Sequence, residues 1–376
     1  MEFSGVIARS VPRLKCRLPA ALVGMVACPA WLLLRSRTGG ASRTLAVGAA
    51  ALGLLLWLAA AMAPALKALG RPVQEGGEPI AILRPPEPED PAKVSLGKRL
   101  FHDARLSGDG TAACTSCHDL NAGGDDGRDR SVGADGKPLA FNAPTIFNIS
   151  RNFRLNWRGE FRSIEEQNEA ALLDPAVMNA NWSDLLRKLQ SDPGYVRSFD
   201  SAYGSSPTRA GVLDALAAFQ RSLVTVDARF DRYLRGERDA LTAEELHGYE
   251  LFKRYGCVAC HQGANVGGNL FQKFGIFADP FAQRKSDDGS DLGRFTVTGL
   301  ERDRHVFRVP SLRNVALTAP YFHDGRTGSL EDAIRIMART QLGRELPETD
   351  VDAIRRFLGT LTGEYHGHPF GKAPER

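Results

Sequence analysis

Hydrophobic side chains recur at helical spacing in the later part of the chain, and runs that alternate apolar with polar residues do not stand out. Apolar residues three and four positions apart lie on one side of a helix. Two such faces consist of Val212, Leu213, Leu216, Phe219 and Leu223, and of Val351, Ile354, Leu358 and Leu361. The pattern therefore predicts a mainly α-helical fold.

Polar residues mark the positions where three further helices should begin. Ser163-Ile-Glu-Glu166 and Thr242-Ala-Glu-Glu245 are capping boxes, in which a hydroxyl and a glutamate satisfy the first free amide groups of a helix. Ser329 has the position of an N-cap, followed by a helical face formed by Leu330, Ala333, Ile334 and Met337. We expect helices to start at these three sites.

The longest apolar stretch runs from Thr44 to Leu66 and contains no charged residue. About 20 apolar residues suffice to cross a bilayer as a helix. Because basic residues precede this stretch, the part of the chain that follows it is expected to be exported. Two interpretations remain open: a transmembrane helix that anchors the protein, or the hydrophobic region of a signal peptide cleaved after Ala61-Met62-Ala63.

The net charge of +4 is spread unevenly over the 376 residues. Residues 1–63 hold seven basic side chains and one acidic one, so they carry +6 and the rest of the chain carries −2. All seven basic residues lie in a leader at 1–43. The working part is therefore slightly acidic, and its charge gives no reason to expect nucleic-acid binding.

A proline-rich segment at residues 67–91 follows the apolar stretch and contains six prolines. Such segments are extended and semi-rigid. We therefore predict a tether that spaces the working part of the protein from the membrane.

Four of the six cysteines form two copies of one pattern, Cys114-Thr-Ser-Cys117-His118 and Cys257-Val-Ala-Cys260-His261. In a C-x-x-C-H motif both thiols bond covalently to one haem, and the histidine is the proximal ligand of the iron. A zinc site and a pair of redox-active dithiols are the alternatives. The wide separation of the two pairs argues against zinc, and the lack of a βαβ pattern argues against dithiols. We therefore predict two covalently bound c-type haems.

The helical pattern and the two motifs divide the chain near residues 228–238. We predict two cytochrome-c-like helical domains, at residues 92–228 and 229–365, each with one covalent haem, and a tail at 366–376. A second haem that carries electrons needs a sixth ligand, for which Met337 and His323 are candidates. Spacing alone also allows Met337 to be an ordinary core methionine.

Longer motifs accompany the two haem sequences. The first half contains Leu100-Phe-His-Asp-Ala-Arg-Leu-Ser107, Asn142-Ala-Pro-Thr145 and Ala217-Ala-Phe-Gln-Arg-Ser-Leu-Val224. The second half contains Phe230-Asp-Arg-Tyr233, Val309-Pro-Ser-Leu-Arg-Asn314, Pro320-Tyr-Phe-His-Asp-Gly325 and Met337 with Gln341-Leu-Gly343. With these motifs, residues 92–365 resemble the bacterial di-haem cytochrome c peroxidases, within the superfamily that includes the protein-modifying enzyme MauG.

The resemblance implies that the N-terminal haem reacts with hydrogen peroxide and that the C-terminal haem passes electrons to it. It makes Met337 the sixth ligand of the C-terminal iron and Gln167 a residue of the distal pocket of the N-terminal haem. It also implies that Trp157 lies between the haems and relays electrons. A calcium ion between the domains is expected at Asn142, Thr318 and Pro320, since oxygen ligands suit this cation.

The resemblance also implies partners and a location. The expected partners are hydrogen peroxide, a small electron-donor protein such as a cytochrome c or a cupredoxin, and the inner membrane through the N-terminal helix. A homodimer is a further expectation. The expected location is the bacterial periplasm, with the protein either anchored by residues 44–66 or released after signal cleavage.

Three positions depart from the family pattern. Ala134 stands where the family has a switchable distal histidine, so we expect the first iron to keep an open sixth position in every redox state. Val177 stands where a glutamate moves protons during O–O cleavage, a function worth typically ~10²–10⁴-fold in rate. Trp157-Arg-Gly-Glu160 exchanges the charges of the family sequence Trp-Asp-Gly-Arg. Candidates to replace the glutamate are Glu166, Glu169 and Asp174.

Two other functions remain open at the level of sequence. One is MauG-like oxidation of a partner protein, with which the missing distal histidine is compatible. Met337 argues against it, since MauG carries tyrosine at that position. The other is a non-catalytic di-haem electron carrier or redox sensor, in which Val177 marks lost peroxidase chemistry.

Overall fold

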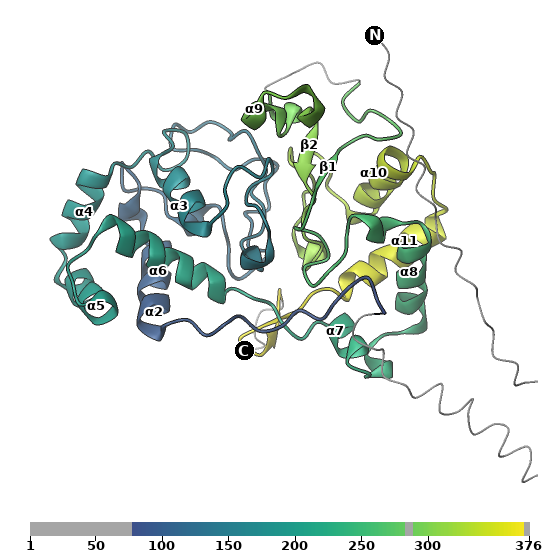
Figure 1. The fold of residues 1–376 in the computed structure, drawn as a ribbon, viewed down its shortest axis with the longest axis horizontal. Helices are drawn as coiled ribbons and strands as arrows, with labels where there is room; N and C mark the ends of the chain where they lie inside the picture. Colours follow the sequence, from purple (N-terminus) through teal and green to yellow (C-terminus); the bar gives the residue numbers. More distant parts are fainter. Residues whose placement is uncertain (1–76, 283–288, 372–376) are drawn as a thin grey trace, which may run out of the picture. The chain divides into compact units, whose positions relative to one another are not determined.

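The computed structural model describes residues 77–282 and 289–371, which belong to one compact unit extending from Arg71 to Arg376 (Figure 1). The predicted leader at 1–43 and the apolar stretch at 44–66 lie outside the described residues. Within the described ranges, no helix is long and apolar enough to cross a bilayer.

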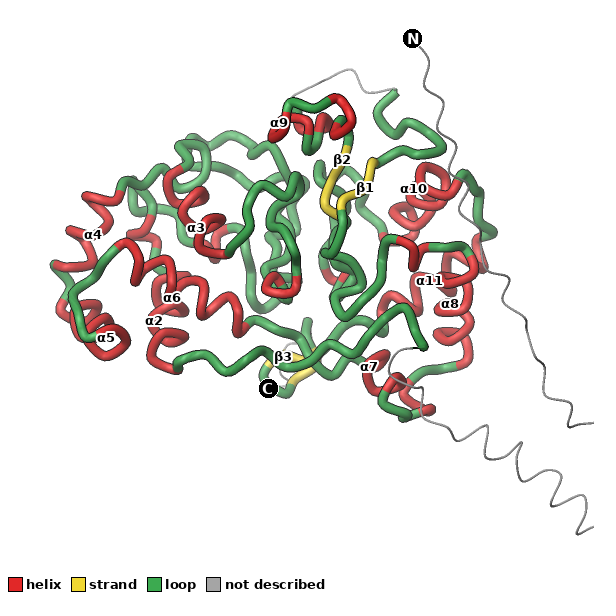
Figure 2. Tube along the Cα trace, viewed as in Figure 1, coloured by secondary structure: helices red, strands yellow, loops and turns green. Residues whose placement is uncertain are grey.

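The described chain is mainly helical, as predicted, and long loops connect the helices (Figure 2). The first half contains α2 (Pro91–Phe101), α3 (Ile164–Leu173), α4 (Trp182–Gln190), α5 (Pro193–Tyr203) and α6 (Arg209–Ser222). The second half contains α7 (Arg229–Leu234), α8 (Ala243–Arg254), α9 (Phe295–Thr298), α10 (Leu330–Leu342) and α11 (Glu348–Gly359). Short 3₁₀ turns are η1 (Ala104–Leu106), η2 (Cys114–Ser116), η3 (Ile149–Arg151), η4 (Arg238–Ala240), η5 (Cys257–Ala259), η6 (Ser290–Leu292), η7 (Glu301–Asp303) and η8 (Val315–Leu317).

Two short antiparallel strand pairs complete the described secondary structure. β1 (Phe271–Lys273) pairs with β2 (Val306–Arg308), and Phe271 lies opposite Arg308. β3 (Glu364–Tyr365) pairs with β4 (His368–Pro369). The first pair lies in the second half and, as shown below, contacts the loop that carries Trp157.

The three predicted helix starts are confirmed. The Ser163 hydroxyl accepts a hydrogen bond from the Glu166 amide and begins α3. The predicted capping box is not completed there, because the Glu166 carboxylate accepts from the Arg162 amide instead of the Ser163 amide. The capping box of α8 is complete, because the Thr242 hydroxyl accepts from the Glu245 amide and the Glu245 carboxylate accepts from the Thr242 amide. Ser329 caps α10 through the Asp332 amide.

Each half is built on one pair of helices that cross at a glycine. A Cβ atom added to Gly97 of α2 would lie 1.9 Å from the carbonyl oxygen of Ala215 in α6. A Cβ atom added to Gly248 of α8 would lie at the same distance from the carbonyl oxygen of Ala353 in α11. Figure 1 shows both pairs, one in each half. The absence of a side chain at these glycines lets the helix backbones touch.

Aromatic residues around each crossing reach the haem motif of the same half. In the first half, the ring centroid of Phe101 lies 5.3 Å from that of Phe219 and 6.5 Å from that of His118. The second half repeats both distances with Phe252, Phe357 and His261. The matching geometry supports the prediction of two cytochrome-c-like halves.

Part of the predicted tether at 67–91 is packed on the protein rather than free. Ile80 and Leu83 are 1% and 2% exposed. Ile80 belongs to the hydrophobic core of the second half, and the Leu83 amide donates to the Asp231 carboxylate at 3.3 Å. The Pro79 carbonyl accepts from the Gly263 amide at 2.9 Å, and the Ala81 carbonyl accepts from Arg313 at 3.0 Å. Composition suggested a spacer because of the prolines, but the apolar side chains between them are buried. We call residues 78–84 the strap.

The C-terminal segment also departs from the predicted boundaries. Phe370, which was assigned to a tail at 366–376, lies 4.3 Å from Phe147 between ring centroids and belongs to the core of the first half. Tyr365 lies 5.1 Å from the same phenylalanine. The strap, which precedes the first half in sequence, therefore packs on the second half. The C-terminal segment, which follows the second half, packs on the first half. The predicted boundaries at 92–228 and 229–365 include neither segment.

Candidate functional site

The first C-x-x-C-H motif lies on the short turn η2 and the residues that follow it. Cys114 and Cys117 form no disulfide, and burial raises the pKa of the Cys114 thiol to about 12. The ring of His118 lies 3.0 Å from the Gly124 carbonyl through Nδ1, and this nitrogen is assigned as the N–H donor. Burial lowers the pKa of His118, which favours the neutral ring that binds metals. The Nε2 atom is thereby left as the ligand.

The second motif repeats this arrangement on η5. Cys257 and Cys260 form no disulfide, and burial raises the pKa of Cys257 to about 12. Burial lowers the pKa of His261 to about 4, and its Nδ1 atom lies 3.4 Å from the Val266 carbonyl. The donor sets of both motifs thus fit a covalently bound haem with a neutral histidine as proximal ligand.

The zinc alternative finds no support in the arrangement of the ligands. Among the residues that the structure describes, one group of three or more potential metal-binding side chains converges, and it consists of Asp291, His323 and Asp324. The cysteines of the two motifs lie on separate turns, one in each half. They do not gather into the four-ligand cluster that a structural zinc ion needs.

The loops that carry Ala134 and Val177, which the family resemblance assigns to the distal side of the haem, meet in the first half. The Ala134 amide donates to the Ala176 carbonyl at 3.0 Å. The Val177 side chain is half-buried and packs on the hydrophobic core of this half. The neighbouring helix α3 carries Gln167, whose Oε1 atom is buried and has no hydrogen-bond partner within the described chain. This oxygen is suited to interact with a group that is not part of the protein.

Each of the three acids considered as a replacement for the missing glutamate is already engaged. The Glu166 carboxylate accepts from the Arg162 amide at 2.8 Å, and that of Asp174 accepts from the Ala176 amide at 2.8 Å. Glu169 accepts from Trp182 and Arg209, and the hydrogen bond from Arg209 holds the pKa of its carboxyl below the usual range. A carboxylate fixed in this way is a poor proton donor near neutral pH.

Trp157 lies where the two halves meet. Its side chain is 8% exposed, and its indole N–H donates to the Asn142 carbonyl at 2.8 Å. Its own carbonyl accepts from the Arg308 amide of β2 at 2.9 Å, so it contacts both halves. Beside it, Arg158 donates to Glu160 at 2.7 Å. The two charges that depart from the family pattern are therefore paired with each other.

Met337 and His323, the two candidates for the sixth ligand, differ in their surroundings. The Nε2 atom of His323 lies 2.7 Å from a carboxylate oxygen of Asp291, and the ring stacks on Phe307 with centroids 4.4 Å apart. Met337 is half-buried on α10 and packs on the aromatic cluster around Trp157. His323 is already held by a carboxylate, so the environment favours Met337 as ligand.

Of the residues expected to bind calcium, Asn142 is hydrogen-bonded to the segment that follows Thr318 and Pro320. The Asn142 amide donates to the carbonyl of His323, three residues after Pro320. The side-chain nitrogen of Asn142 donates to the Arg128 carbonyl at 2.9 Å, which leaves its side-chain oxygen as a potential ligand. Thr318 follows η8 in the same loop. The calcium site remains a prediction.

Two charged residues at the contact between the two halves, Asp291 and Arg308, were not identified as site residues from the sequence. Asp291 lies 32 positions before the histidine it holds, and Arg308 is the last residue of a three-residue strand. Neither belongs to a periodic or spaced motif, so only the tertiary structure reveals them.

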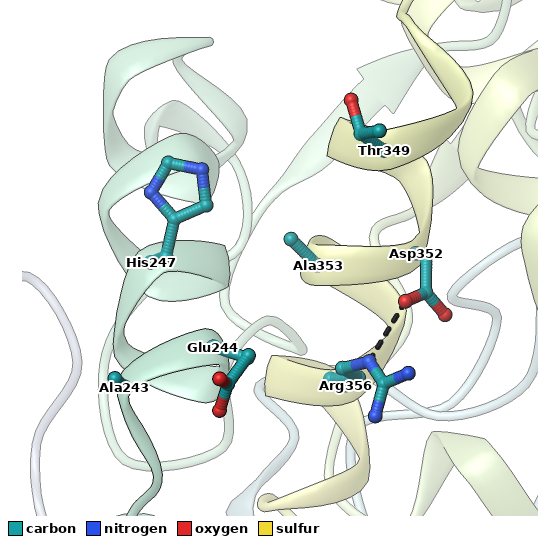
Figure 3. Close-up of a pocket in the computed structure, with 7 residues that line it drawn as sticks. All are labelled: Ala243, Glu244, His247, Thr349, Asp352, Ala353 and Arg356. Atoms are coloured by element: carbon teal, nitrogen blue, oxygen red, sulfur yellow. Dashed lines mark hydrogen bonds and ion pairs between the residues drawn. The ribbon is translucent and has the colours of Figure 1, made fainter.

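A surface cleft between α8 and α11 lies outside this region (Figure 3). It is lined by Ala243, Glu244, His247, Thr349, Asp352, Ala353 and Arg356. Arg356 donates to Asp352 at 2.7 Å, as the figure shows. The cleft contains none of the predicted site residues.

Comparison with known proteins identifies similar sequences over most of the chain. The family of di-haem cytochrome c peroxidases matches at residues 91–239. The cytochrome c peroxidase Ccp of Escherichia coli is 40% identical over 314 residues, which cover 83% of this chain and 67% of that protein. The cytochrome c551 peroxidase of Nitrosomonas europaea is 41% identical over 293 residues, which cover 78% and 86%.

More distant similarities extend to MauG proteins. The methylamine utilization protein MauG of Methylorubrum extorquens is 37% identical over 249 residues, covering 65% of this chain and 68% of that protein. Among solved structures, a MauG-like protein associated with microbial copper homeostasis superposes with a TM-score of 0.68 at 30% identity, covering 77% of this chain and 95% of the other.

Proposed function

Because the chain belongs to the family of di-haem cytochrome c peroxidases, we propose that it reduces hydrogen peroxide to water with electrons from a small redox donor. The observation that carries this proposal is the pair of C-x-x-C-H turns, each with a partly buried histidine whose Nδ1 atom lies 3.0 or 3.4 Å from a backbone carbonyl oxygen. When bound, the two haems supply the redox chemistry, one accepting electrons and the other reducing peroxide.

We assign the second half to the entry of electrons. His261 would hold the iron from the proximal side, with Met337 as the sixth ligand. A thioether ligand raises the potential of a histidine-ligated haem, which suits an electron acceptor. The engagement of His323 by Asp291 supports this choice of ligand.

Trp157 is proposed to help relay electrons to the first half. Its indole is fixed by Asn142, and its backbone is fixed by Arg308 of the other half. A buried aromatic ring held from both sides has a defined position between the two sites. In this role the Trp157 ring carries electrons between the two sites and transfers no proton.

In the first half, His118 would hold the iron, and the distal side is shaped by Ala134, Gln167 and Val177. An alanine cannot ligate iron, so peroxide would have access without prior reduction of the other haem. The unsatisfied Gln167 oxygen would orient the peroxide through a hydrogen bond. With valine at 177, this chain lacks the expected proton carrier, and we expect peroxide cleavage to be slow for the family.

Further parts of the proposal concern the surroundings of the enzyme. We propose a periplasmic location, with residues 44–66 acting as an inner-membrane anchor or a cleaved signal. A cytochrome c or a cupredoxin would be the donor, and a calcium ion would bind at Asn142, Thr318 and Pro320.

Protein oxidation of the MauG type is less supported. Three relatives named as cytochrome c peroxidases are 38–41% identical to this chain, and two MauG relatives are 37% and 31% identical. Met337 also occupies the position at which the family resemblance places tyrosine in MauG. Peroxide reduction is therefore the function that the comparisons and the site favour.

Steady-state peroxide turnover by the di-haem protein, with a reduced small cytochrome as donor, tests the proposal. We expect turnover that saturates with both substrates and is lost in His118→Gly. The matched variant His247→Gly changes a histidine in the cleft between α8 and α11 and should retain full activity. Turnover no faster than that of free haem, in protein shown to carry two haems, would contradict the proposal.

A further inference from the structure

Arg308 is a buried arginine at the contact between the Trp157 loop and the haem motif of the second half. Its side chain is 4% exposed at the end of β2. Its amide donates to the Trp157 carbonyl at 2.9 Å. Two residues later, Pro310 lies beside Gly267 and His261: a Cβ atom added to Gly267 would lie 2.2 Å from the Pro310 carbonyl oxygen and 3.4 Å from Nδ1 of His261. The guanidinium is thus linked through a few residues to both the tryptophan and the proximal histidine.

The charge of this guanidinium is not balanced by the protein. Its Nε atom donates to the Asn156 carbonyl at 3.1 Å and its Nη1 atom to the Val309 carbonyl at 3.4 Å. Within the described chain it forms no ion pair with a carboxylate. Burial alone lowers the pKa of Arg308, to about 10, and no neighbouring acid raises it. A buried charge without a counterion is costly, so an anion from outside the protein is expected here.

Arg313, another buried arginine of the second half, is paired with a carboxylate. Both of its side-chain nitrogens Nη1 and Nη2 donate to the Asp231 carboxylate at 2.8 Å, and both side chains are 0% exposed. Its remaining donors bind the carbonyls of Ala264 and Ala81. The contrast indicates that Arg308 lacks only the carboxylate.

The nearest acid in the Trp157 loop does not fill this role. Glu160 accepts from Arg158 at 2.7 Å and from the Asn156 side chain at 3.4 Å. It makes no ion pair with Arg308, although Arg308 binds the backbone of Asn156. The loop therefore supplies carbonyl oxygens to the guanidinium and keeps its carboxylate for a different arginine.

We propose that Arg308 binds a propionate carboxylate of the haem attached to Cys257 and Cys260, and that its positive charge raises the reduction potential of that haem. The inference rests on the proposed function only in requiring that haem is attached at these cysteines. Haem carries two propionates, and a guanidinium fork binds a carboxylate through two parallel hydrogen bonds. A nearby positive charge favours the ferrous state, which has one positive charge fewer.

Reductive titration of the holoprotein tests the assignment without using peroxide. The wild type is compared with Arg308→Gln and Arg308→Lys, after mass spectrometry has shown two haems on each. The two haems are followed separately through their low-spin and high-spin absorption. In Arg308→Gln we expect the ratio of reduced to oxidised second haem, at fixed applied potential, to fall about tenfold, which is about 59 mV for one electron. Arg308→Lys should give a smaller fall.

Arg294→Gln is the matched control. Arg294 also donates to backbone carbonyls of the Trp157 loop, at 3.0 Å to Arg158 and 3.2 Å to Gly159, but it is only partly buried. Its replacement should leave the ratio within twofold of the wild type. A merely structural role of Arg308 would lower the melting temperature without moving the potential.

An unchanged potential of the second haem in Arg308→Gln, with two haems attached, would overturn the proposal, as would a shift confined to the first haem. If Arg308→Gln yields no holoprotein, Arg308→Met, which removes the charge and keeps an unbranched side chain, decides: a fall of at least twofold supports the proposal, and a smaller change overturns it. Because the readout is a potential, a wild type that holds two haems but does not turn over peroxide would contradict the proposed function and leave this test intact.

Discussion

The amide of Ala134 donates a 3.0 Å hydrogen bond to the carbonyl of Ala176, which joins the loop of Ala134 to the loop of Val177. By resemblance to the family, these loops should carry a histidine at 134 and a glutamate at 177. Here they carry two apolar residues, and the acids nearby are held by other partners. The scaffold of a peroxidase is thus combined with a distal side that lacks its expected proton carrier.

Val177→Glu should raise the rate of peroxide reduction by about 10- to 100-fold. A positioned acid–base group contributes typically ~10²–10⁴-fold, and part of that gain should be lost because the residue packs on a hydrophobic core. Stopped-flow mixing with peroxide measures the rate. Val177→Gln, which has the same size but no titratable proton, is the control and should not accelerate the reaction. Equal rates in all three proteins would contradict the prediction.

Gly97→Ala and Gly248→Ala should each destabilise the fold by at least about 1–3 kcal/mol, the usual cost of overpacking. The added Cβ would lie 1.9 Å from a backbone carbonyl oxygen on the partner helix, so the helices must separate. Denaturant unfolding measures the change. Gly359→Ala at the end of α11 is the control, since nothing lies within 4 Å of its Cβ position, and it should not destabilise the protein.

Helices α3, α6, α8, α10 and α11 and the haem turns could be predicted from the sequence because their signals are local. The N-cap at Ser163, the capping box at Thr242 and the apolar face of α6 each lie within a few turns of the chain. The cysteines and the histidine of each motif are consecutive or nearly so. Such patterns determine local structure before distant parts of the chain are known.

The strap and the arginine at 308 could not be predicted because their partners are distant in sequence. Leu83 donates its amide to Asp231 across 148 positions, and prolines around it suggested a solvated linker. Arg308 belongs to none of the motifs recognised in the sequence. Only the folded chain shows that its side chain is buried and that no carboxylate of the described residues pairs with it. Long-range burial decides the role of both.

Ile80→Ala and Leu83→Ala should each lower the free energy of unfolding by about 2–5 kcal/mol, the usual range for truncation of a buried aliphatic side chain. The two residues are 1% and 2% exposed. A free tether would not respond to such changes. Thermal unfolding of the holoprotein measures the effect, with Pro86→Ala in the same segment as a mild control. Unchanged melting temperatures would show that the strap is not part of the fold.

The stability contributed by Asp103 should depend on pH. Burial acts to raise the pKa of its carboxyl, but hydrogen bonds from Arg105 and Tyr195 outweigh burial and lower it. A carboxyl whose pKa is lower in the folded state stabilises the protein above its unfolded pKa near 3.8, and this contribution is lost as the pH falls. Asp103→Asn should therefore be less stable than the wild type by about 1–3 kcal/mol at pH 7.

The difference between Asp103→Asn and the wild type should shrink as the pH is lowered from 5 toward 3. Chemical denaturation at several pH values measures it. Glu87→Gln, at an exposed carboxylate, is the control and should show no such change. A difference that stays constant over this pH range would contradict the linkage.

Trp157→Phe should slow electron transfer between the two halves while leaving both haem sites intact. The substitution removes the indole N–H that donates to the Asn142 carbonyl, and a phenyl ring is harder to oxidise than an indole. The carbonyl that accepts from Arg308 belongs to the backbone and is retained. Reduction of the second haem by a fast donor, followed by the reoxidation of that haem after peroxide is added, measures the transfer rate. We expect a decrease of about tenfold or more. Phe153→Leu, at an exposed aromatic ring of the same half, is the control and should transfer electrons at the wild-type rate. If Trp157→Phe is equally fast, the tryptophan serves packing between the halves, and electrons pass by another route.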